Sequence, residues 1–195
     1  MWDARFAEPG FAYGTEPNDF LRDIADRFPA GPILSLAEGE GRNGAFLGSL
    51  GHPVHAVDGS AVGLAKAQEL ARASGATLTT ECADLDGWRL PRRDWSGIIA
   101  FYLHLPPGPH RALFGQVAEA LAPGGVFALE AFAPAQLGRP SGGPTDPGRL
   151  HSLAEWQASL AGLQWEVARE VERPLREGKY HVGPAVVFQL FGRRP

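Results

Sequence analysis

The chain has 195 residues, enough for one domain with a substantial core, and 44% of them are hydrophobic while 21% are charged. These proportions exclude a disordered protein, and the net charge of −4 argues against a nucleic-acid partner or a basic membrane-binding patch. The single cysteine, Cys82, excludes an intramolecular disulfide, and we expect it to be buried. No apolar run reaches the length of a membrane span and the N-terminus lacks a signal peptide's core, so we expect a cytoplasmic protein without membrane contact.

Helices and strands alternate through the first two thirds of the chain. Asn18 is placed to cap a first helix that Pro29 ends, and Ser60 is placed to cap a later one. The apolar spacing predicts helices over residues 19–28, 42–50, 61–74 and 110–121, and strands over residues 32–37, 52–58, 76–85, 95–105 and 126–133. Five strands that alternate with helices predict a parallel sheet with right-handed crossovers.

The last third of the chain does not continue the alternation of strands and helices. Residues 134–151 are rich in glycine and proline and predict a long loop, after which Ser152 and Glu155 form a capping box that opens a helix through Leu163. Strands are expected over residues 164–173 and 185–193, and their connection is too short for a helical crossover, so this pair is predicted to be antiparallel. We therefore expect one α/β domain over residues 1–195, with an N-terminal arm and helix over 1–31 and a seven-stranded core over 32–195.

The turn after the first strand is typical of a nucleotide-cofactor site. The sequence GEGRNG, from Gly39 to Gly44, satisfies the dinucleotide pattern G-x-G-x-x-G, and Asp58 follows Gly39 at nearly the spacing of a ribose-binding acid. Glycines let a ligand approach the backbone, and the N–H groups at the start of a helix receive its polar atoms. The pattern by itself does not distinguish an NAD(P) site from other adenosyl cofactors, or from a tight turn without a ligand.

Three other features favour a different cofactor. The C-terminal strand pair is antiparallel, the sequence ADL at residues 83–85 follows the third strand, and LAPGG at residues 121–125 precedes the fifth. A nicotinamide oxidoreductase would also need a substrate domain or a Y-x-x-x-K pair, and neither is present. Together with EGRN and AVD, these motifs resemble class I S-adenosylmethionine (SAM) methyltransferases, in particular the small bacterial type related to the tellurite-resistance and thiopurine methyltransferases.

The resemblance implies a Rossmann-like methyltransferase fold, SAM as cofactor and a set of cofactor-binding residues. Asp58 is expected to bind the ribose, and Asp84 either binds the adenine amino group or caps the turn that follows it. The expected cofactor-binding residues are Tyr13, Ala37, Glu38, Gly39, Gly41, Asn43, Asp58, Gly59, Ala83, Asp84, Leu85 and Phe101.

The cofactor turn also departs from the family pattern. Ser35 stands where the family usually has an acid, and Ala37 replaces the first glycine of the motif. We expect Glu38, or else Glu40, to supply a carboxylate to the methionine ammonium of the cofactor. Ala37 is tolerable if its φ is negative.

Three residues are candidates for catalysis. His104 and Tyr102 lie at the C-terminal end of the fourth strand, where open α/β sheets place their chemistry, and His181 lies in the last turn. The tellurite-resistance relatives carry a His-Arg pair at that turn, but Val182 replaces the arginine here. For each histidine, a structural role competes with a catalytic one. Tyr13 is expected to cover the methionine end of the cofactor, or to fasten the arm to the core.

The sequence thus predicts a SAM-dependent methyltransferase that acts on a small-molecule acceptor, with soft nucleophiles such as a thiol, selenite or tellurite among the candidates. The arm and residues 134–151 are the expected lid. The six histidines show no metal-binding pattern, and either a monomer or a homodimer is compatible with the sequence. The alternatives are an NAD(P)-binding oxidoreductase and a SAM-binding protein without activity.

Overall fold

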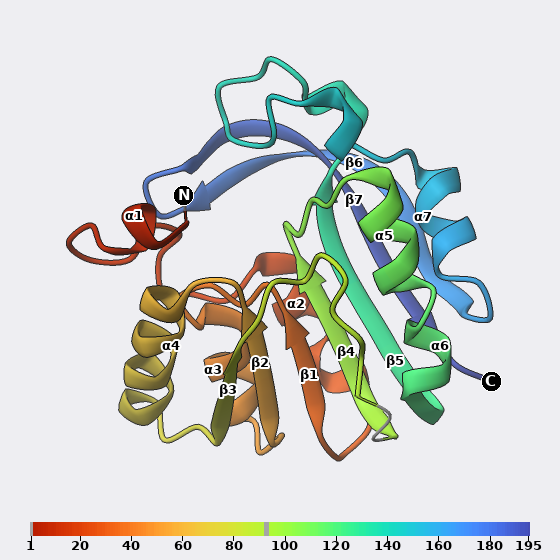
Figure 1. Cartoon of the computed structure of the whole chain (residues 1–195), viewed down its shortest axis with the longest axis horizontal. Coiled ribbons are helices and arrows are strands. Elements are labelled where there is room, and N and C mark those ends of the chain that lie inside the picture. Colours follow the sequence, from red (N-terminus) through yellow and green to blue (C-terminus); the bar gives the residue numbers. More distant parts are fainter. Residues whose placement is uncertain (1, 92–93) are drawn as a thin grey trace.

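The computed structural model describes residues 2–91 and 94–195, which form a seven-stranded sheet of order β3-β2-β1-β4-β5-β7-β6 (Figure 1). Neighbouring strands from β3 to β5 pair in parallel, and β7 pairs antiparallel with both β5 and β6. This topology confirms the predicted sheet with its antiparallel C-terminal pair. The strands are β1 (Ile33–Leu36), β2 (Val54–Asp58), β3 (Leu78–Cys82), β4 (Trp95–Phe101), β5 (Leu121–Phe132), β6 (Gln164–Glu177) and β7 (His181–Arg193).

The helices begin where the capping residues predict. Asn18 accepts a hydrogen bond from the N–H of Leu21, Ser60 accepts one from the N–H of Gly63, and Ser152 forms a capping box with Glu155. The helices are α1 (Trp2–Phe6), α2 (Asp19–Ile24), α3 (Arg42–Ser49), α4 (Ala61–Ala73), α5 (Pro107–Phe114), α6 (Val117–Ala120) and α7 (Leu153–Ser159). Short 3₁₀ turns cover Ala25–Arg27, Pro134–Gln136 and Pro147–Arg149.

Several predicted boundaries were wrong. The fifth strand begins at Leu121 and not at residue 126, so the LAPGG segment that was expected to precede it lies inside β5. The helix expected over residues 110–121 is two short helices, because the Gln116 N–H bonds to the Leu113 carbonyl, three residues back, and interrupts the α-helical pattern next to Gly115, a residue type that weakens helix interiors. The last two strands continue past their expected ends, since the register places Pro174 directly opposite Pro184 and neither strand needs an N–H donor there. The expected eleven-residue connection is therefore a tight turn over residues 178–180.

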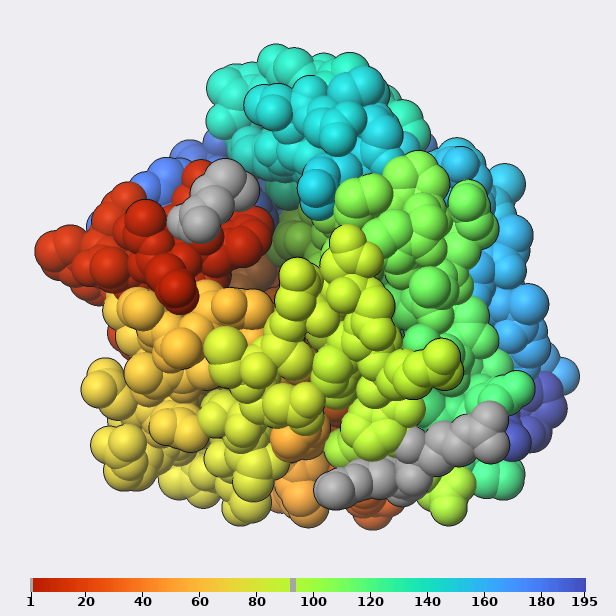
Figure 2. Space-filling model, in the orientation of Figure 1, coloured from red at the N-terminus to blue at the C-terminus, as the bar shows by residue number. Residues whose placement is uncertain are grey.

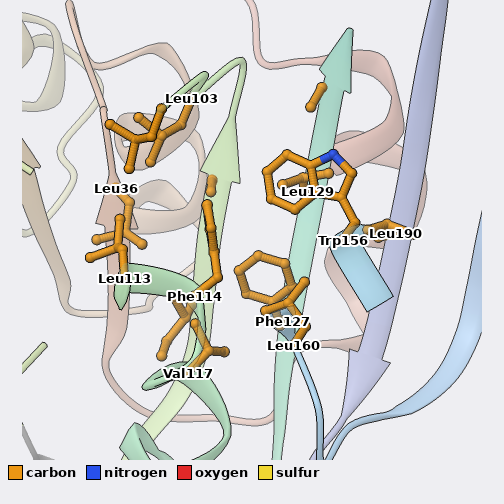
Figure 3. Packing of buried hydrophobic residues seen from close by; sticks show 14 of the residues in the cluster. Leu36, Leu103, Leu113, Phe114, Val117, Phe127, Leu129, Trp156, Leu160 and Leu190 are labelled. Atoms are coloured by element: carbon orange, nitrogen blue, oxygen red, sulfur yellow. The ribbon is translucent and has the colours of Figure 1, made fainter. Parts of the chain in front are cut away.

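The central strands of the sheet are buried on both faces, whereas the edge strands β3 and β6 are partly exposed. In β4, Ile98 and Ala100 belong to one core cluster, while Ile99 and Phe101 belong to the other. Helices α5, α6 and α7 cover the first face, and Figure 3 shows their side chains on β4 and β5, with Trp156 fully buried. Helices α2 and α3 cover the second face through Phe20, Leu21 and Leu47 of their clusters.

The long β6–β7 hairpin bends over the C-terminal edge of the sheet and reaches the N-terminal arm (Figure 1). At its tip, Lys179 N–H donates to the Ala12 carbonyl (2.8 Å) and the Tyr180 hydroxyl donates to Glu8 (2.6 Å). Gly178 has φ 62°, and a Cβ there would lie 2.3 Å from the Ala12 oxygen, so this position requires glycine. The arm and the tip of the hairpin are thus bonded to each other, and together they cover the carboxyl ends of β1 and β4.

Within residues 2–91 and 94–195, no helix is both long enough and apolar enough to cross a membrane. Cys82 was expected to be buried, and this expectation was wrong: its thiol is exposed at the end of β3, which is an edge strand.

Candidate active site

The turn between β1 and α3 has the left-handed conformation of a tight glycine loop. Gly39 has φ 62° and Gly41 has φ 96°, and a Cβ at Gly41 would lie 2.5 Å from the backbone of Ala67 in α4. Gly41 is therefore required by the close approach of two helices. Ala37 also has a positive φ of 55°, so the condition under which an alanine would be tolerated without strain is not met, and the turn carries backbone strain.

Glu38 lies inside this turn with only 8% of its surface exposed. One carboxylate oxygen accepts the N–H of Gly44 at 2.7 Å, and the other accepts the hydroxyl of Ser35. Burial raises the pKa of Glu38 to about 7. The carboxylate expected to face the methionine ammonium is thus bonded within the turn on both of its oxygens.

Asp58, at the end of β2, holds the turn from its other side. Its two carboxylate oxygens accept the N–H groups of Gly39 and Ser60, each at 2.8 Å. Burial raises its pKa, and these two hydrogen bonds act in the opposite direction. A carboxylate offers about four acceptor positions, so two remain for the hydroxyls of a ribose. A Cβ at the next residue, Gly59, would lie no closer than 3.8 Å to its nearest neighbour, so this edge is open.

The remaining residues expected at the cofactor divide between the surface and the core. Asp84 is exposed, and its carboxylate accepts the N–H of Asp86 at 3.0 Å, the turn-capping contact that its sequence position suggested. Ala83 is half-buried and follows β3, whereas Leu85 and Phe101 are buried in the two core clusters. Asn43 is also occupied, since its side-chain oxygen accepts the N–H of Asn18 at 3.0 Å.

The N-terminal arm lies directly on the cofactor turn. The Phe6 ring fills the space beside Gly39 and Gly63, where a Cβ would lie 3.2 Å and 2.8 Å from it. Glu40 accepts the N–H of Ala12 at 2.6 Å and pairs with Lys66 at 2.9 Å. The second candidate for the ammonium partner therefore fastens the arm.

The second part of the site, which we call the acceptor end, is formed by Tyr102, Glu130, Glu177 and His181. Tyr102 follows β4 with a positive φ of 57°, a conformation that is costly for an aromatic residue and that concentrates at functional sites. Its hydroxyl donates to Glu130 at 2.6 Å. Burial raises the pKa of Tyr102 well above its usual value, and the Glu130 carboxylate adds to this shift, so the hydroxyl stays protonated.

Glu130 is completely buried at the centre of a network of polar side chains. Beside Tyr102, the side chains of Asn18 and Gln189 each donate to it at 2.8 Å, and Arg173 lies 3.1 Å away. Sequence reasoning missed this residue. Its one signal is an acid within an otherwise apolar strand, because a carboxylate there must find partners when it is buried.

His181 forms a carboxylate–imidazole dyad with Glu177. Its Nδ1 lies 3.1 Å from the Glu177 carboxylate, which also pairs with Arg42 at 2.9 Å. Burial opposes the ionised form of Glu177, but hydrogen bonds from His181 and Arg42 lower its pKa to about 2. Burial lowers the pKa of His181, so the ring is neutral at pH 7 and its Nδ1 carries the proton that the carboxylate accepts.

The imidazole ring of the dyad lies among aromatic rings. The ring centroid of His181 lies 4.4 Å from that of Tyr102, 4.5 Å from that of Tyr13 and 5.2 Å from that of Phe132. No hydrogen bond to Nε2 is seen among the described residues, and the His181 side chain is largely buried. An imidazole nitrogen that carries no proton and has no donor partner can accept a proton.

His104 has a different environment, unfavourable for a base. The N–H of Phe132 donates to its Nε2 at 3.4 Å, and its Nδ1 lies 3.3 Å from the Arg149 carbonyl. Burial lowers its pKa to about 3. Both ring nitrogens of His104 are hydrogen-bonded and the ring resists protonation. A structural role for His104 is therefore better supported than a catalytic role.

The Gly/Pro-rich loop closes the acceptor end. The loop is pinned by Ser141, whose hydroxyl donates to the Pro184 carbonyl at 2.7 Å, and by His151, which contacts the Leu105 carbonyl at 2.8 Å. A Cβ at Gly142 would lie 2.8 Å from the His181 ring. Figure 2 shows a hollow between the red N-terminal arm, the green segment after β4 and the teal loop of residues 134–151.

The residues present fit an adenosyl cofactor. A glycine turn between β1 and α3, a carboxylate at the end of β2 and an open Gly59 form a cradle at the carboxyl edge of a parallel sheet. No group of three or more His, Cys, Asp or Glu residues within 2–91 and 94–195 is arranged to hold a metal ion.

Comparisons with known proteins agree with this geometry. Residues 33–125, slightly less than half of the chain, match the model of a family described as a methyltransferase domain. No curated relative matches the chain at a significant level. The matched segment contains both carboxylates of the cofactor turn.

Several solved structures share the fold. One, from a study of the conversion of a disulfide bond into a thioacetal group during echinomycin biosynthesis, has a TM-score of 0.72 and 21% identity, over 99% of this chain and 90% of that chain. TehB from Haemophilus influenzae has a TM-score of 0.76 and 15% identity, over 91% and 62% respectively. Magnesium protoporphyrin IX methyltransferase (ChlM) from Synechocystis PCC 6803, with bound SAH, has a TM-score of 0.65 and 22% identity, over 90% and 80%. The family match supports a methyltransferase domain over residues 33–125, and these neighbours, all below 25% identity, show that the chain has the Rossmann-like methyltransferase fold.

Proposed function

We propose that this protein transfers the methyl group of SAM to a small, uncharged acceptor with a soft nucleophile, of which a thiol is the first choice. The observation that carries this proposal is the Glu177–His181 dyad, whose free Nε2 lies among Tyr13, Tyr102 and Phe132. A neutral imidazole takes up the proton that a thiol or hydroxyl acceptor loses.

The charges around the dyad favour an uncharged acceptor over an oxyanion such as selenite or tellurite. Arg42 and Arg173 both pair with Glu177 at 2.9 Å. Val182, which follows the dyad histidine, carries no charge and is 55% exposed. The nearby cations are thus neutralised by carboxylates, and an anionic substrate would gain little from them.

Each group has a distinct task in this proposal. When bound, SAM supplies a methyl group on a sulfonium sulfur, which is already activated toward a nucleophile. Asp58 and the turn at Gly39 hold the adenosyl part. Tyr13, Tyr102 and Phe132 line the acceptor and exclude water, and His181 accepts the proton at Nε2 while Glu177 fixes the ring. The neighbour from echinomycin biosynthesis comes from a study of the conversion of a disulfide bond into a thioacetal group, and this sulfur chemistry supports a sulfur acceptor.

The proposal is tested first by ligand-dependent melting. SAM and S-adenosylhomocysteine should raise the melting temperature, because a ligand that binds only the folded state stabilises it, and NAD and NADP at the same concentration should not. A shift with NAD and none with SAM would contradict the cofactor assignment.

Methyl transfer is then measured with labelled SAM and matched thiol, alcohol, amine, selenite and tellurite acceptors. Transfer to thiols above the others supports the proposal. Transfer to selenite or tellurite alone would contradict the uncharged acceptor, and binding of SAM without transfer to any acceptor would identify a binding protein without this activity.

A further inference from the structure

A buried carboxylate, Glu38, lies three residues after Ser35, the position where the family usually has an acid. Glu38 bridges Ser35, near the end of β1, and Gly44, in the first turn of α3. The bridge spans the whole cofactor turn, because Ala37, Gly39 and Gly41 all lie between the two residues that it connects.

The space for this bridge is built into α3. A Cβ at Gly44 would lie 3.1 Å from the carboxyl carbon of Glu38 and 3.2 Å from one of its oxygens. It would also lie 2.8 Å from the Leu78 side chain. The absence of a side chain at position 44 thus lets the Glu38 carboxylate reach the backbone N–H of the helix.

We infer that Glu38 is a positioning residue that clamps the cofactor turn by hydrogen bonds to Ser35 and Gly44, and that it does not pair with the ammonium group of the cofactor. Only the identity of the cofactor in this inference rests on the proposed function. The clamp holds the left-handed Ala37 and Gly39 in the conformation that exposes the turn to a ligand.

The hydrogen-bond geometry supports a clamp over a charged contact. Both carboxylate oxygens are bound within the turn, and the side chain is buried beside a second carboxylate, Asp58, with Arg42 as the opposing charge. Burial and Asp58 both favour the protonated form. A glutamine would keep the arrangement without any charge, since its oxygen accepts the Gly44 N–H and its amide donates to the Ser35 hydroxyl.

The test compares Glu38→Gln with Glu38→Ala in the full chain. Each variant is measured for its melting temperature without ligand and, by calorimetry, for its affinity for S-adenosylhomocysteine and for 5′-methylthioadenosine, which lacks the amino-acid end. We expect Glu38→Gln to keep both properties. We expect Glu38→Ala to melt at least about 2–4 °C lower and to bind both ligands more weakly by the same factor, roughly tenfold.

Several outcomes would overturn the inference. If Glu38→Gln bound S-adenosylhomocysteine tenfold more weakly but 5′-methylthioadenosine normally, the carboxylate would be an ammonium partner. If Glu38→Ala matched the wild type in melting and binding, no clamp would exist. If Glu38→Ala does not fold, Ser35→Ala replaces it: this variant loses one of the two hydrogen bonds and should show the same effects at smaller size, and no change in it would count against the clamp.

Failure of the proposed function gives a different result. A wild-type protein that binds neither adenosyl ligand would contradict the cofactor assignment. The melting temperatures of the ligand-free variants would still decide whether Glu38 clamps the turn.

Discussion

The two ends of the site are held together in opposite ways. At the cofactor end, the hydrogen bonds of Glu38 and Asp58 join side chains to backbone N–H groups or a hydroxyl that are 3, 6 and 19 positions away in sequence. At the acceptor end, side chains meet across 112, 135 and 159 positions, as Asn18, Arg42, Glu130 and Glu177 do.

This difference predicts different sensitivity. The cofactor turn is a local structure whose bonds to neutral backbone groups each contribute modestly. The acceptor network consists of buried charges, and removing one member leaves its partners buried and unpaired, which costs more than the lost bond itself. The following changes range from the largest expected effect to the smallest.

The largest effect is expected at Glu130. Glu130→Gln removes the negative charge beside Arg173. It also places an amide NH₂ group opposite the Gln189 side chain, which already donates a hydrogen bond at that position. We therefore expect the free energy of unfolding, measured by urea titration, to fall by about 3–5 kcal/mol. The matched control is Glu172→Gln, whose ion pair with Arg139 is exposed and should contribute less than about 1 kcal/mol. Equal losses in both variants would show that the buried network is no more demanding than the surface.

The next effect concerns the dyad. His181→Gln removes the proton acceptor, and we expect kcat with a thiol acceptor to fall by roughly 10²-fold, the low end for general-base catalysis because thiols ionise readily. Since the pKa of His181 is lowered from 6.5, the base is neutral at pH 7, and wild-type activity should decline only below pH 6.5, as the ring becomes protonated.

His104→Gln serves as the control for that variant. His104 is bonded at both nitrogens and its pKa is about 3, so this change should lower stability and leave the acid limb of the pH profile in place. If the acid limb vanished in His104→Gln and persisted in His181→Gln, the roles of the two histidines would be reversed.

At the cofactor end, Asp58→Ala is expected to weaken SAM binding at least tenfold, because charge-assisted hydrogen bonds contribute about 1.5–3 kcal/mol each. It should also lower the melting temperature, since Gly39 and Ser60 lose their acceptor. Asp84→Ala, measured alongside by calorimetry, changes affinity only if Asp84 contacts the adenine. Unchanged affinity in a folded Asp58→Ala variant would make Asp58 a turn residue only.

The smallest effect is a gain. Ala37→Gly relieves a positive φ of 55°, and we expect unfolding free energy to rise by about 0.5–1 kcal/mol after the added freedom of the unfolded chain is counted. The same change in helix α3, Ala45→Gly, should lower it by about 1 kcal/mol. A loss at both positions would show that the strain at Ala37 is negligible.

The local part of the site could be predicted from sequence. The glycine turn, the caps at Asn18 and Ser60 and the strand-end position of Asp58 all depend on residues close together in the chain. The same local patterns predicted the order of elements and the antiparallel ending. They failed where the partner was distant: Asn43 binds Asn18 and Glu40 binds Ala12 and Lys66, so their placement beside the cofactor motif did not reveal their contacts.

The sequence by itself determined the sheet, its cofactor turn and the carboxylate at the end of β2, because backbone propensity, capping and hydrophobic period act over a few residues. Only the tertiary structure decided that Glu38 turns back to Ser35 and Gly44, and that His181 rather than His104 has a free nitrogen. The ionisation and direction of these side chains depend on burial and on partners far away in the chain. Those are set when the N-terminal arm, the end of β5 and the β6–β7 hairpin meet above the sheet.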